Sequence, residues 1–156
     1  MTITTPATAT EMTDRNLDAA CSAVTGEISR TDTKASLLLA FNGAVLAGLA
    51  SLADRGLPTV AKAAGVLAVL ALGAAAVLLL LVVRPRLAEE DRASFPHWAR
   101  LDDTEILAGM HSDHRPARIR VLSTIAVRKF THLRRAVDLT LTALLLLAPA
   151  AVGLAR

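Results

Sequence analysis

The sequence has few aromatic residues and almost no cysteine. Its 156 residues include no tyrosine and only 3% aromatic residues, although 53% of them are apolar. The apolar residues are therefore mostly alanine, leucine and valine, a mixture that suits lipid-facing helices better than the interlocking core of a soluble domain. Because Cys21 is the only cysteine, an intrachain disulfide and a cysteine-based zinc cage are excluded.

Motifs of catalysis and of nucleic-acid binding are lacking as well. His111 and His114 flank Asp113, but no further histidine or cysteine nearby completes a metal site. The glycines form no phosphate-cradling loop, and the four histidines are too scattered to indicate a catalytic triad. The net charge of +3 comes from 14 arginines and three lysines, which we do not read as a sign of a nucleic-acid polymer as partner. We therefore expect a protein that is not an enzyme and has no cofactor or metal.

Long uncharged runs dominate the rest of the sequence. Residues 35–53 and 63–83 carry no charge over 19 and 21 positions, each about long enough to cross a bilayer as a helix at about 1.5 Å per residue. A third run, residues 139–155, becomes long enough when it is extended to 136–155. The sequence therefore predicts an all-α membrane protein with three transmembrane helices.

The first 34 residues are polar and contain no apolar core before a cleavage site, so we expect the N-terminus to remain attached. The distribution of basic residues sets the orientation. Residues 84–138 hold 11 of the 17 basic residues, whereas the loop between the first two runs has only Arg55 and Lys62. By the positive-inside rule, the N-terminus and residues 84–135 face the cytoplasm of a multi-pass inner-membrane protein, and the C-terminus faces out.

Helical periodicity continues outside the uncharged runs. A stripe of apolar residues precedes the first run, and a second stripe begins near Pro116, so the first and third spans are expected to extend into the cytoplasm. A capping box at residues 102–105 predicts a short cytoplasmic helix through Met110. The stripes comprise Leu17, Cys21, Val24, Ile28, Ala35 and Leu39 in the first helix and Leu122, Ile125, Ala126, Leu133 and Val137 in the second.

These features give one plan of the chain. It comprises a disordered N-terminus (1–12), a cytoplasmic amphipathic helix (13–34), the first span (35–53), an external hairpin loop (54–62), the second span (63–83), a cytoplasmic segment (84–135) with a short helix and the start of a long one, and the third span (136–155).

Two ionisable residues lie on the apolar stripes. Lys129 falls near the centre of the second stripe, and Asp32 lies on the first stripe one turn before the hydrocarbon begins. Lys129 either extends its ammonium to the bilayer surface or to an acidic partner, or it serves a ligand or a switch. Asn42 continues the first stripe into the membrane, where helix packing with a hydrogen bond is the simplest role.

Five arginines cluster near the expected cytoplasmic surface. Such residues hold the topology and meet anionic lipid headgroups, or they form a pocket for a single phosphate, which a guanidinium binds through two hydrogen bonds. The five are Arg84, Arg86, Arg128, Arg134 and Arg135.

Three segments are similar to one known family. They are Ile28 to Leu39 (ISRTDTKASLLL) with the following Asn42-Gly43, Arg84-Pro85-Arg86, and Leu122 to Phe130 (LSTIAVRKF). Over about residues 15–155 the chain resembles the transmembrane effectors of Pycsar anti-phage defence, the PycTM type. The resemblance implies a partner pyrimidine cyclase that makes cyclic CMP or cyclic UMP on infection. It also implies an effector that damages the inner membrane and kills or arrests the cell.

Within that hypothesis, the candidate ligand-binding residues are Asp32, Lys34, Arg84, Arg86, Arg128 and Lys129. Lys129 with Arg84 or Arg86 would bind the phosphate, and Asp32 would accept a hydrogen bond from the base or restrain Lys129 at rest. The expected partners are the bilayer, the cyclic pyrimidine nucleotide and further copies of the chain. The alternative is a structural membrane protein of plasmid transfer. A cyclase gene or a conjugative ATPase gene beside this one would distinguish the two.

Overall fold

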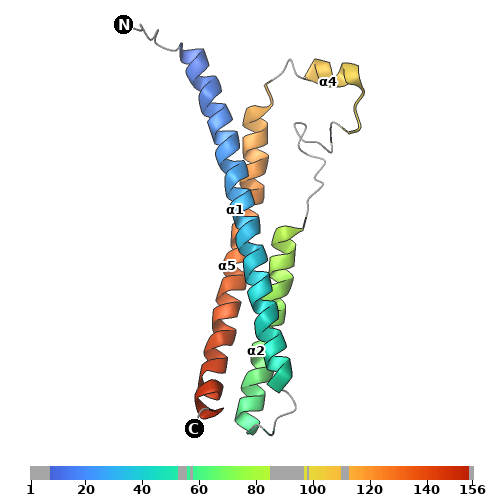
Figure 1. Ribbon diagram of the computed structural model, residues 1–156. Helices are drawn as coiled ribbons and strands as arrows, with labels where there is room; N and C mark the ends of the chain where they lie inside the picture. Colours follow the sequence, from blue (N-terminus) through green and yellow to red (C-terminus); the bar gives the residue numbers. More distant parts are fainter. Residues whose placement is uncertain are drawn as a thin grey trace, which may run out of the picture. The chain divides into compact units, whose positions relative to one another are not determined.

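The computed structural model describes residues 8–52, 56, 58–84, 97, 99–109 and 113–154, with side chains up to residue 149. The elements of these residues are all helical: α1 (Ala9–Leu52), α2 (Thr59–Val83), α4 (Asp103–Gly109) and α5 (Arg115–Leu154) (Figure 1). The expected all-α class is confirmed. Arg86, His111 and residues 54, 55 and 57 of the expected hairpin loop lie outside the described residues.

The chain divides into two compact units. Unit 1 comprises residues 1–29 and 85–127, and unit 2 comprises residues 30–84 and 128–156. The long helices α1 and α5 each contribute to both units.

Unit 2 is a bundle of three helical segments, in which α2 packs against α1 and α5 (Figure 1). Two buried apolar clusters hold it together. The first groups Ala35 of α1 with Val82 near the end of α2, and the second brings Ala68, near the start of α2, to Val45 further along α1. Since the α1 positions rise as the α2 positions fall, α2 is antiparallel to α1. Contacts between α1 and α5 rise together in both helices, so these two helices are parallel.

The buried side chains of unit 2 recur at alternating spacings of four and three residues. This 3.5-residue period is the signature of coiled-coil packing, in which side chains of one helix fit between those of the next. Each α5 position lies 98 residues after its α1 partner, as Thr140 does after Asn42. The positions are Thr31, Ala35, Leu38, Asn42, Val45 and Leu49 in α1; Ala68, Leu72, Ala75, Leu79 and Val82 in α2; and Lys129, Leu133, Ala136, Thr140, Ala143 and Leu147 in α5.

Unit 1 continues the same spacing in α1 and α5 with half-buried residues. They are Leu17, Cys21, Val24 and Ile28 in α1, and Arg115, Ile119, Leu122 and Ala126 in α5.

The starts of the helices follow from local hydrogen bonds. The backbone N–H of Thr8 donates to Glu11 Oε2 (2.8 Å), and that of Glu11 donates back to Thr8 Oγ1 (3.3 Å). This reciprocal cap starts α1 at Ala9, four residues before the expected start near residue 13. At α4 the backbone N–H of Glu105 donates to Asp102 Oδ1 (2.8 Å), and Glu105 Oε2 accepts from the Asp102 N–H (3.1 Å), as expected for the capping box.

Two helices, α1 and α2, are long and apolar enough to cross a membrane. Only 28% of the apolar window of α2 is buried, so most of its leucines and valines face outward, as in a lipid-facing helix. These helices indicate a membrane protein. Among the described residues, the third expected span is not one of these helices; the uncharged part of α5 begins after Asp138, and the helix ends at Leu154. A membrane-spanning α5 therefore remains a prediction.

Candidate functional site

Asp32 and Lys129 form an ion pair between α1 and α5 in unit 2. Lys129 Nζ lies 2.5 Å from Asp32 Oδ1 and 2.8 Å from Asp32 Oδ2. The lysine side chain is 10% exposed and the aspartate side chain is 35% exposed. The ammonium is therefore enclosed, while its partner carboxylate is still reached by solvent.

The coiled-coil spacing explains this geometry. Lys129 occupies an inward-facing position of α5, one turn before Leu133, and Asp32 is the flanking residue next to the inward-facing Thr31 of α1. Leu133 shares a cluster with Val82 in the last turn of α2, so the pair lies close to the level at which α2 ends. The lysine side chain crosses the interface to the one carboxylate within its reach among the described residues.

Three of the other candidate ligand residues, Lys34, Arg84 and Arg128, are dispersed over unit 2. Lys34, Arg84 and Arg128 are exposed, and Arg86 lies outside the described residues. Lys34 is two residues from Asp32, about 200° around a helix, so the two side chains leave α1 on opposite sides. Of the six candidates, the structure brings Asp32 and Lys129 into contact.

A second polar contact, between Asn42 and Thr140, lies further along α1 and α5 in unit 2. Asn42 and Thr140 are 0% and 3% exposed, and Thr140 Oγ1 lies 3.2 Å from both Nδ2 and Oδ1 of Asn42. The threonine hydroxyl is also 2.9 Å from the carbonyl oxygen of Ala136. When the hydroxyl donates to Ala136, it still accepts from Asn42 Nδ2. The expectation that Asn42 packs between helices with a hydrogen bond is confirmed.

Unit 1 contains a network of carboxylates around Arg115. The guanidinium donates to Asp14 Oδ1 (2.5 Å), Asp18 Oδ1 (3.1 Å) and Asp113 Oδ1 (2.9 Å), which ties the first turn of α5 to α1. The hydrogen bonds that the guanidinium donates to these carboxylates, that to Asp113 foremost, raise the pKa of Arg115 above its ordinary value. The Arg115 side chain in turn lowers the pKa of the Asp113 carboxyl. The network thus joins α1 and α5 by ion pairs in the polar part of the chain.

The sequence patterns did not predict the roles of Arg115 and Thr140. Both occupy inward-facing positions of the 3.5-residue pattern, 98 residues after Leu17 and Asn42. The signal that identifies them is the pairing of this pattern in α1 and α5, since a polar residue at an inward position needs a polar partner across the interface. Among the described residues, no group of three metal-ligating side chains is found.

Comparison with known proteins gives the family. Neither the curated proteins nor the solved structures contain a match to the chain. The sequence model of the Pycsar effector protein domain, PycTM, matches residues 16–156, which includes all of α2, α4 and α5 and most of α1. The match covers both units and both polar contacts of unit 2, and it agrees with the segments that suggested the resemblance. The chain therefore belongs to the Pycsar effector family, the effectors of an anti-phage defence.

Proposed function

We propose that the chain is a membrane-embedded effector of a bacterial Pycsar system, which a cyclic pyrimidine nucleotide, cCMP or cUMP, activates to disrupt the inner membrane and abort the infection. In this proposal the chain is not an enzyme, and a separate cyclase makes the nucleotide. Membership of the family and the two apolar helices support the proposal. So does the basic character of residues 84–135, the segment expected on the cytoplasmic side.

The enclosed Asp32–Lys129 ion pair is the observation that carries the proposed mechanism. A buried ammonium needs an anionic partner, because removing that partner leaves an uncompensated charge. The cyclic phosphate carries one negative charge and can replace the Asp32 carboxylate as that partner. Asp32, with 35% of its side chain exposed, is the member of the pair that solvent can stabilise after the exchange.

The exchange couples ligand binding to the packing of α1 against α5. At rest, Asp32 holds Lys129 across the interface. Once the phosphate binds Lys129, this contact is lost, and the two helices can adopt another arrangement. A ligand that moves the population from 1:99 to 99:1 must bind the active arrangement about 5.5 kcal/mol more tightly, which several charge-assisted hydrogen bonds can supply. Arg84 at the end of α2, or Arg86, is the proposed second phosphate ligand.

The membrane arrangement is part of the proposal. We propose that α1, α2 and α5 all span the inner membrane, with the N-terminus and residues 84–135 in the cytoplasm, and that several copies assemble. The Asp32–Lys129 pair then lies at the cytoplasmic end of the spans, where a soluble nucleotide has access to it.

Calorimetry of the purified protein in detergent tests the site. We expect cCMP or cUMP to bind the wild type, and Lys129→Met to weaken binding by about 10- to 100-fold, the loss of one charge-assisted contact. Arg135→Gln is the matched control, because it removes one exposed positive charge from the same helix and should leave the affinity unchanged. Unchanged binding by Lys129→Met would remove this residue from the site, and binding of neither nucleotide by the wild type would refute the proposed ligand.

Activation is tested in cells. When a pyrimidine cyclase is co-expressed with the wild-type chain, we expect loss of membrane potential. Lys129→Met should abolish that loss while the protein stays in the membrane fraction. Loss of potential that is independent of the cyclase would contradict nucleotide activation.

A further inference from the structure

The interface between α1 and α5 in unit 2 has two sides, and α2 covers one of them. On the covered side, the flanking residues are leucines that pack against the two buried clusters: Leu39, Leu46, Leu139 and Leu146. On the other side, which we call the open flank, the corresponding residues are Lys34 and Phe41 of α1 and Phe130, Val137 and Leu144 of α5. These residues belong to neither cluster.

The open flank is apolar and exposed along most of its length. Phe41 is 46% exposed and Phe130 is 42% exposed, which is unusual for large aromatic side chains. The neighbouring outward positions Leu37 and Leu141 are also exposed, at 69% and 53%. A surface of this kind favours contact with hydrocarbon.

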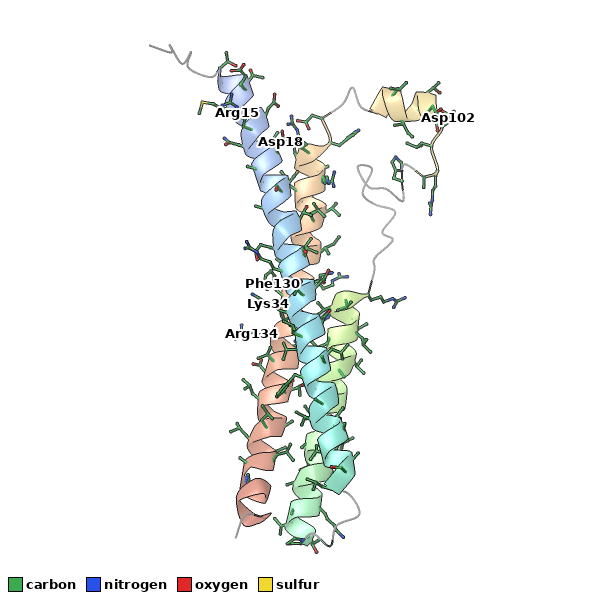
Figure 2. The ribbon with its side chains drawn as sticks, in the orientation of Figure 1. Arg15, Asp18, Lys34, Asp102, Phe130 and Arg134 are labelled. Carbon is green, nitrogen blue, oxygen red and sulfur yellow. The ribbon has the colours of Figure 1, made fainter. Side chains whose placement is uncertain are left out.

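Two positively charged residues lie near one end of the open flank, between Phe130 and Val137. Arg134 is one turn after Phe130 on the same face of α5, and Lys34 is the flanking residue of α1 nearest that level (Figure 2). Both side chains are exposed, and neither has a hydrogen bond or ion pair with another described residue. Two cations therefore lie near one end of an apolar surface that continues toward Phe41 and Leu144.

This distribution fits an amphiphile with an anionic head and an apolar tail. A cyclic nucleotide offers the phosphate but no apolar group to cover Phe41 and Val137. A second copy of the chain in a two-fold arrangement would bring its own Lys34 and Arg134 toward the same cations, which is repulsive. An anionic phospholipid matches both the charge and the apolar surface.

We infer that the open flank binds an anionic phospholipid, with its phosphate at Lys34 and Arg134 and an acyl chain along Val137, Phe41 and Leu144. The inference rests on the proposed span of α5. It also assigns Lys34 to a lipid, on the side of α1 opposite to Asp32 and the proposed nucleotide site. Both proposed sites bind a phosphate group. At Lys129 it belongs to the cyclic nucleotide, and at Lys34 and Arg134 it belongs to the lipid headgroup.

Native mass spectrometry of the full chain, released from mixed micelles of phosphatidylglycerol and phosphatidylcholine, tests the inference. We expect the wild type to retain phosphatidylglycerol preferentially. Lys34→Gln with Arg134→Gln should lower that preference by about 30-fold, since each basic residue near the surface contributes about 1 kcal/mol. Arg120→Gln with Arg135→Gln is the matched control, because it removes two exposed cations from α5 outside the open flank and should retain the preference.

Each other result contradicts the inference in its own way. An equal loss in both double variants indicates a general basic surface without a defined lipid site. Displacement of the lipid by millimolar inorganic phosphate or cCMP assigns the cations to free phosphate. A dimer that persists in either lipid and is weakened by Phe130→Ala assigns the flank to a second copy. A reporter fused after Arg156 reads the topology of α5 separately, so a failure of the proposed third span is distinguished from a failure of lipid binding.

Discussion

Asn42 and Thr140 lie opposite each other in one layer of unit 2, with Thr140 Oγ1 3.2 Å from both polar atoms of the Asn42 amide. The two residues are not equivalent in this contact. Thr140 has a second partner in the carbonyl of Ala136, whereas the Asn42 side-chain amide has no partner other than Thr140 among the described residues. Both are buried among apolar side chains, where a polar group without a partner is destabilising. Because only Thr140 has a second partner, removing Thr140 should cost more free energy of unfolding than removing Asn42.

Thr140→Val should destabilise the protein more than Asn42→Leu. The valine leaves the buried amide of Asn42 without a partner, while Asn42→Leu leaves the Thr140 hydroxyl bonded to Ala136. We expect a difference of about 1 kcal/mol, within the range measured for hydrogen bonds between membrane helices. Reversible unfolding in mixed micelles of mild detergent and dodecyl sulfate measures it. Equal losses in the two variants would mean that the Asn42 amide finds another partner.

The Asp32–Lys129 pair predicts a second asymmetry. Asp32→Asn leaves the enclosed Lys129 ammonium without an anion and should lower the free energy of unfolding by about 3 kcal/mol, the low end for a buried ion pair because Asp32 is partly exposed. Lys129→Met removes the buried charge and leaves a carboxylate that solvent reaches, so its cost should stay below about 1 kcal/mol. The same unfolding experiment compares them. Equal losses in the two variants would mean that the ion pair itself is the dominant contribution, and a larger loss in Lys129→Met would mean that the unpaired Asp32 carboxylate is the more costly charge.

The Arg115 network predicts a pH dependence in unit 1. Because Arg115 lowers the pKa of Asp113 below the ordinary 3.8, the contribution of Asp113 is fully present above about pH 4 and is lost as the pH falls through the lowered pKa. Arg115 stays charged throughout, since its pKa is raised. Carboxyl-carbon NMR should follow the titration of Asp113. In Arg115→Gln the Asp113 pKa should return toward 3.8, and an unchanged value would show that other groups lower it.

The alanines at inward-facing positions predict that larger side chains there destabilise the bundle of unit 2. Ala136 is fully buried between the three helices of unit 2, whereas Ala40 faces outward on α1. Ala136→Leu should destabilise the bundle by about 1 to 3 kcal/mol because the helices must move apart, and Ala40→Leu should have little effect. Thermal unfolding in detergent compares the two. Equal melting temperatures would mean that the helices are not in close contact at Ala136.

Much of the fold could be predicted from the sequence because apolar helices carry a strong periodic signal. The uncharged runs predicted α2 and the second half of α1, and Asp32 and Lys129 were recognised as ionisable residues on apolar stripes. The exact inward-facing positions were predicted less well from the sequence. A straight helix turns 100° per residue, so the expected stripes drifted to Leu39 and Val137, whereas supercoiled helices keep Leu38 and Ala136 inward.

The polar contacts were harder to predict, and the reason is their dependence on a partner helix. The sequence patterns gave Arg115 no role, because nothing near it in sequence shows the carboxylates of α1. Thr140 lies inside an uncharged run, where a hydroxyl is common. Their pairing becomes visible only once α1 and α5 are known to be parallel with an offset of 98 residues.

That offset also sets the order in which the protein can be completed during synthesis. In the proposed membrane arrangement, the ribosome makes α1 and α2 well before Lys129 and Thr140, so Asp32 and Asn42 lack their partners while the first two helices insert. An amide waiting in hydrocarbon is costly, and that cost favours capture of α5 as soon as it arrives. The last helix, α5, thus completes the polar contacts of the bundle. A chain truncated before α5 should be less stable in the membrane.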